Sequence, residues 1–221
     1  MKKLIYTLLL TCIHAQFSQA QFMRYTGKIW SISTSIQPIT TFRQELVKTN
    51  LNAFSGSFEI GKKLFTGIYP TIGYTYTKSN GDTMIDARTF DRNKLYFTNA
   101  HSINAGVLIQ KHLFTIQSRR VAGGCFVQSL SFFVMPEYSF MFVDGPRVNK
   151  SKGEFALKTG ICLVNTHSAA IAKSFLWGVY YRKGFSPILS YKDEFGEQNL
   201  YKNEVGIQLR ILFRQRYNFL Q

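Results

Sequence analysis

Lys202-Asn-Glu-Val-Gly-Ile-Gln-Leu-Arg-Ile-Leu-Phe-Arg214 is the stretch of sequence that decides the fold. Every second residue from Val205 to Phe213 is apolar, and the positions between hold glycine and polar residues, with Leu212 as the exception. A period of two indicates a β-strand, because a helix has a period of about 3.6 and would mix the two faces. An apolar face opposite a polar, glycine-containing face is typical of a barrel wall in lipid. The alternative is an amphipathic strand of a soluble sandwich.

Seven earlier segments show the same alternation. They cover residues 28–37, 54–64, 66–78, 100–113, 128–143, 153–164 and 174–185. The connections after the first, third, fifth and seventh segments span 38–53, 79–97, 144–152 and 186–201, whereas those after the second and sixth are shorter. The connection at 114–127 is intermediate in length and does not fit the alternation of long and short connections. An even strand number with alternating long and short connections is outer-membrane topology. The sequence predicts an all-β fold, an antiparallel up-and-down transmembrane β-barrel of eight strands.

The first twenty residues have the pattern of a Sec-type signal peptide. Lys2 and Lys3 precede a short apolar run, and a small residue, Ala20, comes before the expected cut at Gln21. We therefore expect a cleaved signal peptide at 1–20 and a barrel domain at 21–221, located in the cell outer membrane. No later stretch reaches the roughly eighteen apolar residues of a spanning helix, so only a closed barrel could cross a membrane.

The last strand also resembles the β-signal of outer-membrane β-barrel proteins. The matching positions are Glu204, Gly206, Leu209 and Ile211. This resemblance implies recognition by the barrel-assembly machinery. With the signal peptide and the aromatic-rich alternating strands, the mature chain resembles the small outer-membrane β-barrel proteins of Bacteroidota, similar in architecture to OmpA- and OmpX-type barrels. The family implies structural, adhesive or accessory roles, in some members within secretion or surface assembly.

An eight-stranded barrel has an interior that side chains fill, so charges on its inner face must pair. We predict an interior ion-pair network formed by Glu59, Glu137, Glu154, Lys158, Arg182 and Arg210. The alternative is that some of these residues lie near the rims and are solvated.

The formal net charge of +15 is the most unusual feature of the composition. Cleavage would remove Lys2 and Lys3 and leave +13. In the expected topology a basic periplasmic rim, with no acid among its members, consists of Lys62, Lys63, Lys111, Arg119, Arg120, Lys173, Arg214 and Arg216. Such a rim attracts anions. It could anchor the barrel among headgroups by snorkelling, or bind a periplasmic or envelope-complex protein. Nucleic acid is not an expected partner of an exported protein.

Motifs of enzymes are not found. The histidines are scattered, and no nucleophile elbow or phosphate loop occurs. Two pairs, His101-Ser102 and His167-Ser168, could suggest a lipid A deacylase, but neighbouring residues of a strand point to opposite faces. The leading expectation is a non-enzymatic barrel without cofactor, either an accessory subunit of an envelope or secretion complex or a loop-displaying surface protein. A lipid-modifying enzyme and a soluble periplasmic lipocalin-like carrier are the alternatives.

Overall fold

The computed structural model describes residues 30–44, 50–65, 67–79, 99–121, 124–144, 148–151, 153–167, 173–193 and 196–213. The expected signal peptide, 1–20, lies outside these residues. The described part consists of ten strands: β1 (Trp30–Gln44), β2 (Asn50–Lys62), β3 (Ile68–Ser79), β4 (Asn99–Val121), β5 (Gly124–Asp144), β6 (Val148–Ser151), β7 (Gly153–His167), β8 (Lys173–Gly184), β9 (Leu189–Asp193) and β10 (Gly196–Phe213).

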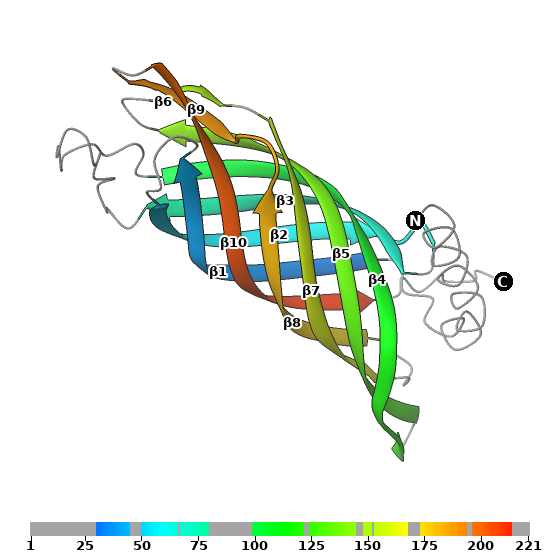
Figure 1. Cartoon of the computed structure of the whole chain (residues 1–221). Helices are drawn as coiled ribbons and strands as arrows, with labels where there is room; N and C mark the ends of the chain where they lie inside the picture. Colours follow the sequence, from blue (N-terminus) through cyan, green and yellow to red (C-terminus); the bar gives the residue numbers. More distant parts are fainter. Residues whose placement is uncertain are drawn as a thin grey trace, which may run out of the picture.

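Eight of these strands close into a barrel (Figure 1). Strands β1, β2, β3, β4, β5, β7, β8 and β10 are neighbours in that order, and β10 pairs back onto β1. Every pairing is antiparallel, with Trp30 opposite Phe213 at the closing seam. Two short strands extend the sheet beyond the barrel: β9 pairs with β10, and β6 pairs with β9. The predicted eight-stranded, up-and-down barrel is confirmed. Among the described residues, no helix is long and apolar enough to cross a membrane.

The two ends of the barrel differ in the number of residues that separate the strands joined there. We call the end where β1 begins and β10 ends the base, and the opposite end the crown. Base connections cover residues 63–67, 122–123 and 168–172, and the crown holds the remaining connections, including 80–98. No base connection exceeds five residues, and all crown connections between barrel strands except 45–49 are longer, which suits outer-membrane topology.

Strands occupy part of four predicted connections: 38–53, 114–127, 144–152, which contains β6, and 186–201, which contains β9 and the start of β10. The expected loop 38–53 shrinks to 45–49, since β1 passes Pro38 by a register shift between Ile36 and Ile39. A proline lacks the backbone N–H of a regular ladder, and a bulge accommodates it. The expected loop 114–127 shrinks to 122–123. Register shifts at 112–114 and 115–117 disturb the alternation there and hide the strand from a period-two search.

The faces of the barrel are inverted relative to a soluble protein. On β10, Ile207 is 57% exposed, whereas Gln208 and Arg210 are buried. The same outward apolar pattern holds on other strands, with exposed Phe54, Phe58, Ile72, Ile103, Val107, Phe140, Phe155, Trp177 and Val179. Charged residues are almost never fully buried in proteins unless they are paired. An apolar outer band around a polar interior suits a barrel surrounded by lipid.

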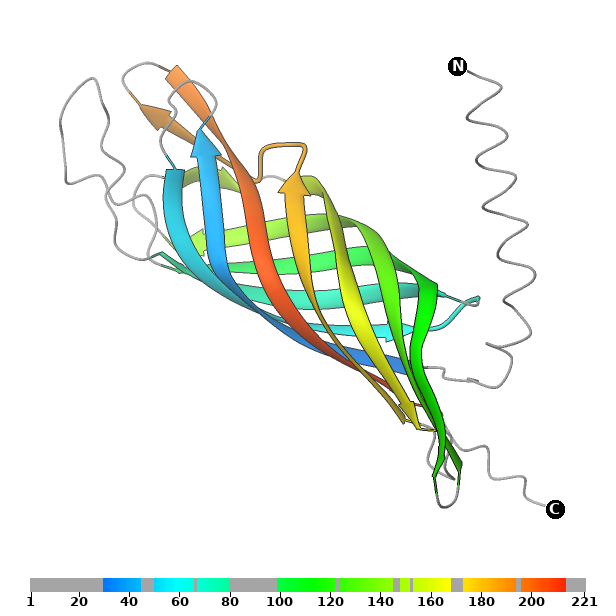
Figure 2. The ribbon, with the colours of Figure 1, turned by 60° about the horizontal axis from the view of Figure 1, so that its bottom comes forward.

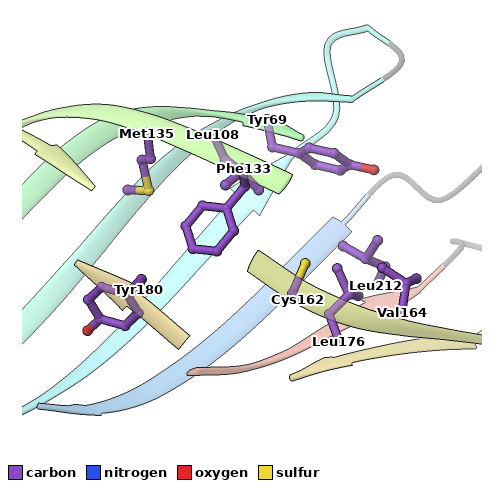
Figure 3. Close-up of a cluster of buried hydrophobic side chains, with 9 residues drawn as sticks. All are labelled: Tyr69, Leu108, Phe133, Met135, Cys162, Val164, Leu176, Tyr180 and Leu212. Carbon is purple, nitrogen blue, oxygen red and sulfur yellow. The ribbon is translucent and has the colours of Figure 1, made fainter. Parts of the chain in front are cut away.

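The interior is layered along the barrel axis. A base cluster of apolar side chains consists of Tyr69, Leu108, Phe133, Met135, Cys162, Val164, Leu176, Tyr180 and Leu212 (Figure 3). A crown cluster consists of Phe42, Ala53, Ala100, Met141, Ile188, Leu189 and Leu200. Charged side chains lie between the two clusters. The order is visible on β10, where interior residues change from Leu200 through Lys202, Glu204 and Arg210 to Leu212.

Candidate functional site: a charged belt inside the barrel

Glu59 of β2 is the centre of the ion pairs nearest the base. Its carboxylate lies 2.6 Å from Nζ of Lys158 and 3.0 Å from an Nη atom of Arg210. The hydroxyl of Ser33 donates a further hydrogen bond to it at 3.0 Å. These residues come from β2, β7, β10 and β1, so the contacts join distant parts of the barrel wall. One carboxylate thus compensates two buried cations.

Arg182 of β8 is the second centre and binds three glutamates. Its Nε contacts Glu137, an Nη atom lies 2.5 Å from Glu154, and Nε lies 3.4 Å from Glu204. Lys202 adds a 2.7 Å contact to Glu204. A planar guanidinium with several fixed donors suits this role, because it can meet more than one carboxylate at once.

The six residues of the expected network therefore lie together in the interior, and two more join them. We call Glu59, Glu137, Glu154, Glu204, Lys158, Arg182, Lys202 and Arg210 the charged belt. None of the eight is more than 4% exposed. Four acids face four bases, so the belt is formally neutral. Lys202 and Glu204 share the inward face of β10 with Gln208 and Arg210, and the alternation itself could have identified them.

Tyr180 connects the belt to the base cluster. Nζ of Lys158 lies 4.3 Å from the centroid of the Tyr180 ring, within cation–π range. The hydroxyl of Tyr180 accepts a hydrogen bond from Gln37 and donates one to Ser35 at 3.1 Å. Because Gln37 and Ser35 lie on β1, this ring extends from β8 over the inner face of β10 to β1 and helps to fill the interior.

Glycines opposite the large interior side chains make room for them. Gly73 pairs with Glu59 across β2 and β3, and a Cβ atom at Gly73 would lie 2.8 Å from Cγ of Glu59. Gly106 pairs with Glu137 in the same way across β4 and β5, where a Cβ would lie 3.0 Å from the Glu137 side chain. Glycine at these two wall positions thus leaves space for the side chains of the charged belt.

The remaining space in the belt is very small. A polar cavity of about 10 Å³, lined by residues that include Glu59, Lys158 and Arg182, has room for about one water molecule. Its lining is polar, so this cavity does not suit an apolar ligand. The described interior therefore supports neither an open diffusion pore nor the hollow apolar interior that a lipocalin-like carrier requires.

The assembly-signal residues divide between the two faces of β10. Glu204 and Gly206 point inward, where Glu204 belongs to the charged belt and Gly206 lies opposite Tyr180. Leu209, 46% exposed, points outward, and Ile211 shares its face. Each position therefore has a structural role in the folded barrel. Recognition by the barrel-assembly machinery stays a prediction.

The basic rim residues that are described lie at the base. Lys62 is exposed with its Nζ 5.5 Å from the Trp30 ring centroid, and Lys63 and Lys111 are half-buried nearby in the wall. The backbone places Arg119 and Arg120 beside the β4–β5 turn and Lys173 at the start of β8. The remaining two members, Arg214 and Arg216, lie outside the described residues.

The histidine pairs do not form a catalytic dyad in the described part of the chain. His101 contacts the Tyr74 hydroxyl through Nδ1 on the outer face, whereas Ser102 is buried in the interior. His112 lies 3.4 Å from the hydroxyl of Thr115. Ser168, the partner considered for His167, lies outside the described residues. Within those residues, no group of three or more histidine, cysteine, aspartate or glutamate side chains could hold a metal ion.

The fold and site define an eight-stranded antiparallel barrel with a paired, charged interior and an apolar exterior. No family model matches the chain, and no curated protein matches it. The chain is similar to the crystal structure of Neisserial surface protein A (NspA), with 11% identity, a TM-score of 0.39, and coverage of 83% of this chain and 96% of that chain. It is also similar to the translocator domain of the autotransporter NalP from Neisseria meningitidis, with 10% identity, a TM-score of 0.28, and coverage of 93% and 97%.

Proposed function

We propose that this chain is an integral outer-membrane β-barrel without enzymatic activity that serves as a structural, accessory subunit of an envelope complex. The observation that carries the proposal is the inverted burial: a neutral belt of eight charges inside and an apolar band outside. In water, such an exterior would be a large exposed apolar surface, which soluble monomers rarely have. When lipid surrounds the barrel, the same apolar exterior is energetically favourable.

The proposal includes export by the signal peptide at 1–20 and insertion by the barrel-assembly machinery. The base would then face the periplasm, because short connections of such barrels lie on that side. Basic residues at the base support this orientation, since cations there can snorkel to headgroups. A role as a closed scaffold is supported by the charged belt and the two apolar clusters, which fill the described interior.

Membrane fractionation, followed by gel electrophoresis with and without boiling, tests the proposal. We expect the chain to stay with the outer membrane after carbonate extraction and to change mobility when heated, because a closed barrel resists unfolding in detergent. A chain that carbonate releases, with the same mobility in both samples, would contradict integration. An altered lipid A profile in a deletion strain would instead favour the lipid-modifying enzyme.

A further inference from the structure

The base of the barrel has a step between β3 and β4. Ile68, where β3 begins, pairs with Ile109 of β4, and among the described residues the last backbone hydrogen bond on that side runs from Gln110 N–H to the carbonyl oxygen of Gly67. β4 nevertheless continues to Val121, held on its other side by β5. The β4–β5 hairpin projects beyond the other strands in both views (Figure 1 and Figure 2). We call β4 residues 111–117 the free edge, because no described strand pairs with them on the β3 side.

The free edge belongs outside the hydrocarbon layer. Unpaired backbone N–H and C=O groups cannot face lipid tails, because each would cost several kcal/mol. Lys62 and Lys63 adjoin the β2–β3 turn beside the step, and Lys111 is the first residue of the free edge. These cations mark the headgroup level. The rest of the edge therefore extends to the aqueous side of the base, where its backbone groups can meet water or another strand.

Three apolar side chains are exposed along the free edge. Leu113 is 45% exposed, Phe114 55% and Ile116 52%. Natural edge strands are usually protected from pairing by charges, prolines or a cover. Here the stretch 112–118 contains no lysine, arginine, acid or proline. An exposed edge with apolar side chains is the surface to which an extended segment adds as a further strand.

The charge of the β4–β5 hairpin indicates which kind of segment can pair with the free edge. Residues 110–131 contain Lys111, Arg119 and Arg120, and no aspartate or glutamate. A second copy pairing antiparallel would bring these basic residues toward one another, which is unfavourable. The segments that precede β1 and follow β10 in the sequence, 21–29 and 214–221, also contain basic residues and no acidic side chain. Charge complementarity therefore indicates a different, acidic partner.

We propose that the free edge is a docking site at which a periplasmic protein adds an extended strand with apolar and acidic side chains. The apolar side chains would pack against Phe114 and Ile116, and the acidic ones would meet the basic residues of the hairpin. This inference rests on the proposed function, because it requires the base to face the periplasm. It also names the partner class that an accessory subunit of an envelope complex would need.

Peptide binding to the full chain in phospholipid nanodiscs tests the site. The probe is a fluorescein-labelled peptide of about ten residues that alternates valine and glutamate, compared with one that alternates valine and lysine. We expect fluorescence anisotropy to detect the acidic peptide only. Phe114→Ser with Ile116→Ser, and Arg119→Glu with Arg120→Glu, should each weaken binding by at least about tenfold. Lys78→Glu with Lys183→Glu, two exposed lysines toward the crown, is the charge-matched control for the arginine variant and should leave binding unchanged.

Amide hydrogen exchange identifies where the peptide binds. We expect residues 112–117 to exchange more slowly when the acidic peptide is present. Binding that is equal for both peptides, or unaffected by the hairpin variants, would overturn the docking site. So would edge amides already protected by the nanodisc lipid without peptide, which would indicate a membrane contact instead. Each sample is also run with and without boiling. A chain with heat-dependent mobility but no acidic-peptide binding loses only the docking site, whereas a chain that never inserts loses the proposed function as well.

Discussion

Gly206 of β10 lies directly opposite Tyr180 of β8, and a Cβ atom at Gly206 would stand 2.5 Å from Cζ of the Tyr180 ring. Hydrogen bonds with Gln37 and Ser35 hold the hydroxyl of that ring at β1, the next strand beyond β10. The ring cannot move aside without losing them. The missing side chain at Gly206 therefore allows the Tyr180 ring to pass over β10 and reach β1.

Gly206→Ala should lower the free energy of unfolding by about 1–3 kcal/mol, because an added methyl group overpacks the interior. Urea unfolding in lipid vesicles, followed by tryptophan fluorescence, measures the change. In the Tyr180→Ala background the same substitution should cost much less, since the collision is gone. The two changes are thus expected to be non-additive. Strictly additive effects would mean that Gly206 acts through assembly rather than through packing.

Glu59→Gln should strongly destabilise the barrel, by about 3–5 kcal/mol, because Lys158 and Arg210 would both lose their carboxylate partner in a buried site. The substitution keeps the size of the side chain, so packing changes little. The midpoint of urea unfolding provides the measurement.

Glu137→Gln is the matched comparison for that variant. Arg182 keeps Glu154 and Glu204 when Glu137 is neutralised, so we expect a smaller loss of about 1–3 kcal/mol. If Glu137→Gln cost as much as Glu59→Gln, the arrangement around the two centres would be incorrect.

Arg182→Lys should destabilise the barrel, because lysine cannot replace this arginine in the charged belt. It keeps the charge, but a compact ammonium cannot reproduce the fixed guanidinium donors that meet Glu137, Glu154 and Glu204. We expect a clear fall in the temperature at which the heat-dependent gel shift occurs. Lys183→Arg, an exposed neighbour on the same strand, should leave that temperature unchanged.

Ile207→Arg tests the outer face. Ile207 is 57% exposed, so a soluble protein would tolerate arginine there with little effect. On a lipid-facing surface the same change should destabilise the barrel by about 2–4 kcal/mol near the bilayer midplane. Ile116→Arg, on the projecting hairpin and 52% exposed, is the control and should change stability little. Equal tolerance at both positions would contradict a lipid-facing β10.

The alternation of residues was sufficient to predict the closing strand, the strand number and the antiparallel order, because period two reports directly which face is buried. It failed where bulges shift the register, at Ile36–Ile39 in β1 and at 112–117 in β4. Both β4 and β5 were therefore predicted too short, and the projecting hairpin was missed. A bulge depends on pairing with a neighbour, which one strand's sequence does not reveal.

The sequence predicted which residues form the charged belt better than it predicted which of them contact one another. Inward charges of a narrow barrel must pair, which identified Glu59 and Arg182 without coordinates. Their partners depend on the stagger of the strands around the barrel, as in the contact from Glu59 on β2 to Lys158 on β7. Lys202 and Glu204 were missed, although the alternation of β10 places both on the inner face.

Tryptophan quenching in a Trp30→Phe variant tests the central claim most directly. The sequence contains two tryptophans, so Trp177 alone would then report, and its side chain is 50% exposed on the outer face of β8. In vesicles of phospholipid with brominated acyl chains, we expect strong quenching of Trp177, with little further effect of aqueous acrylamide. Strong quenching by acrylamide and none by the brominated lipid would show that this face meets water, and would contradict a barrel with lipid around it.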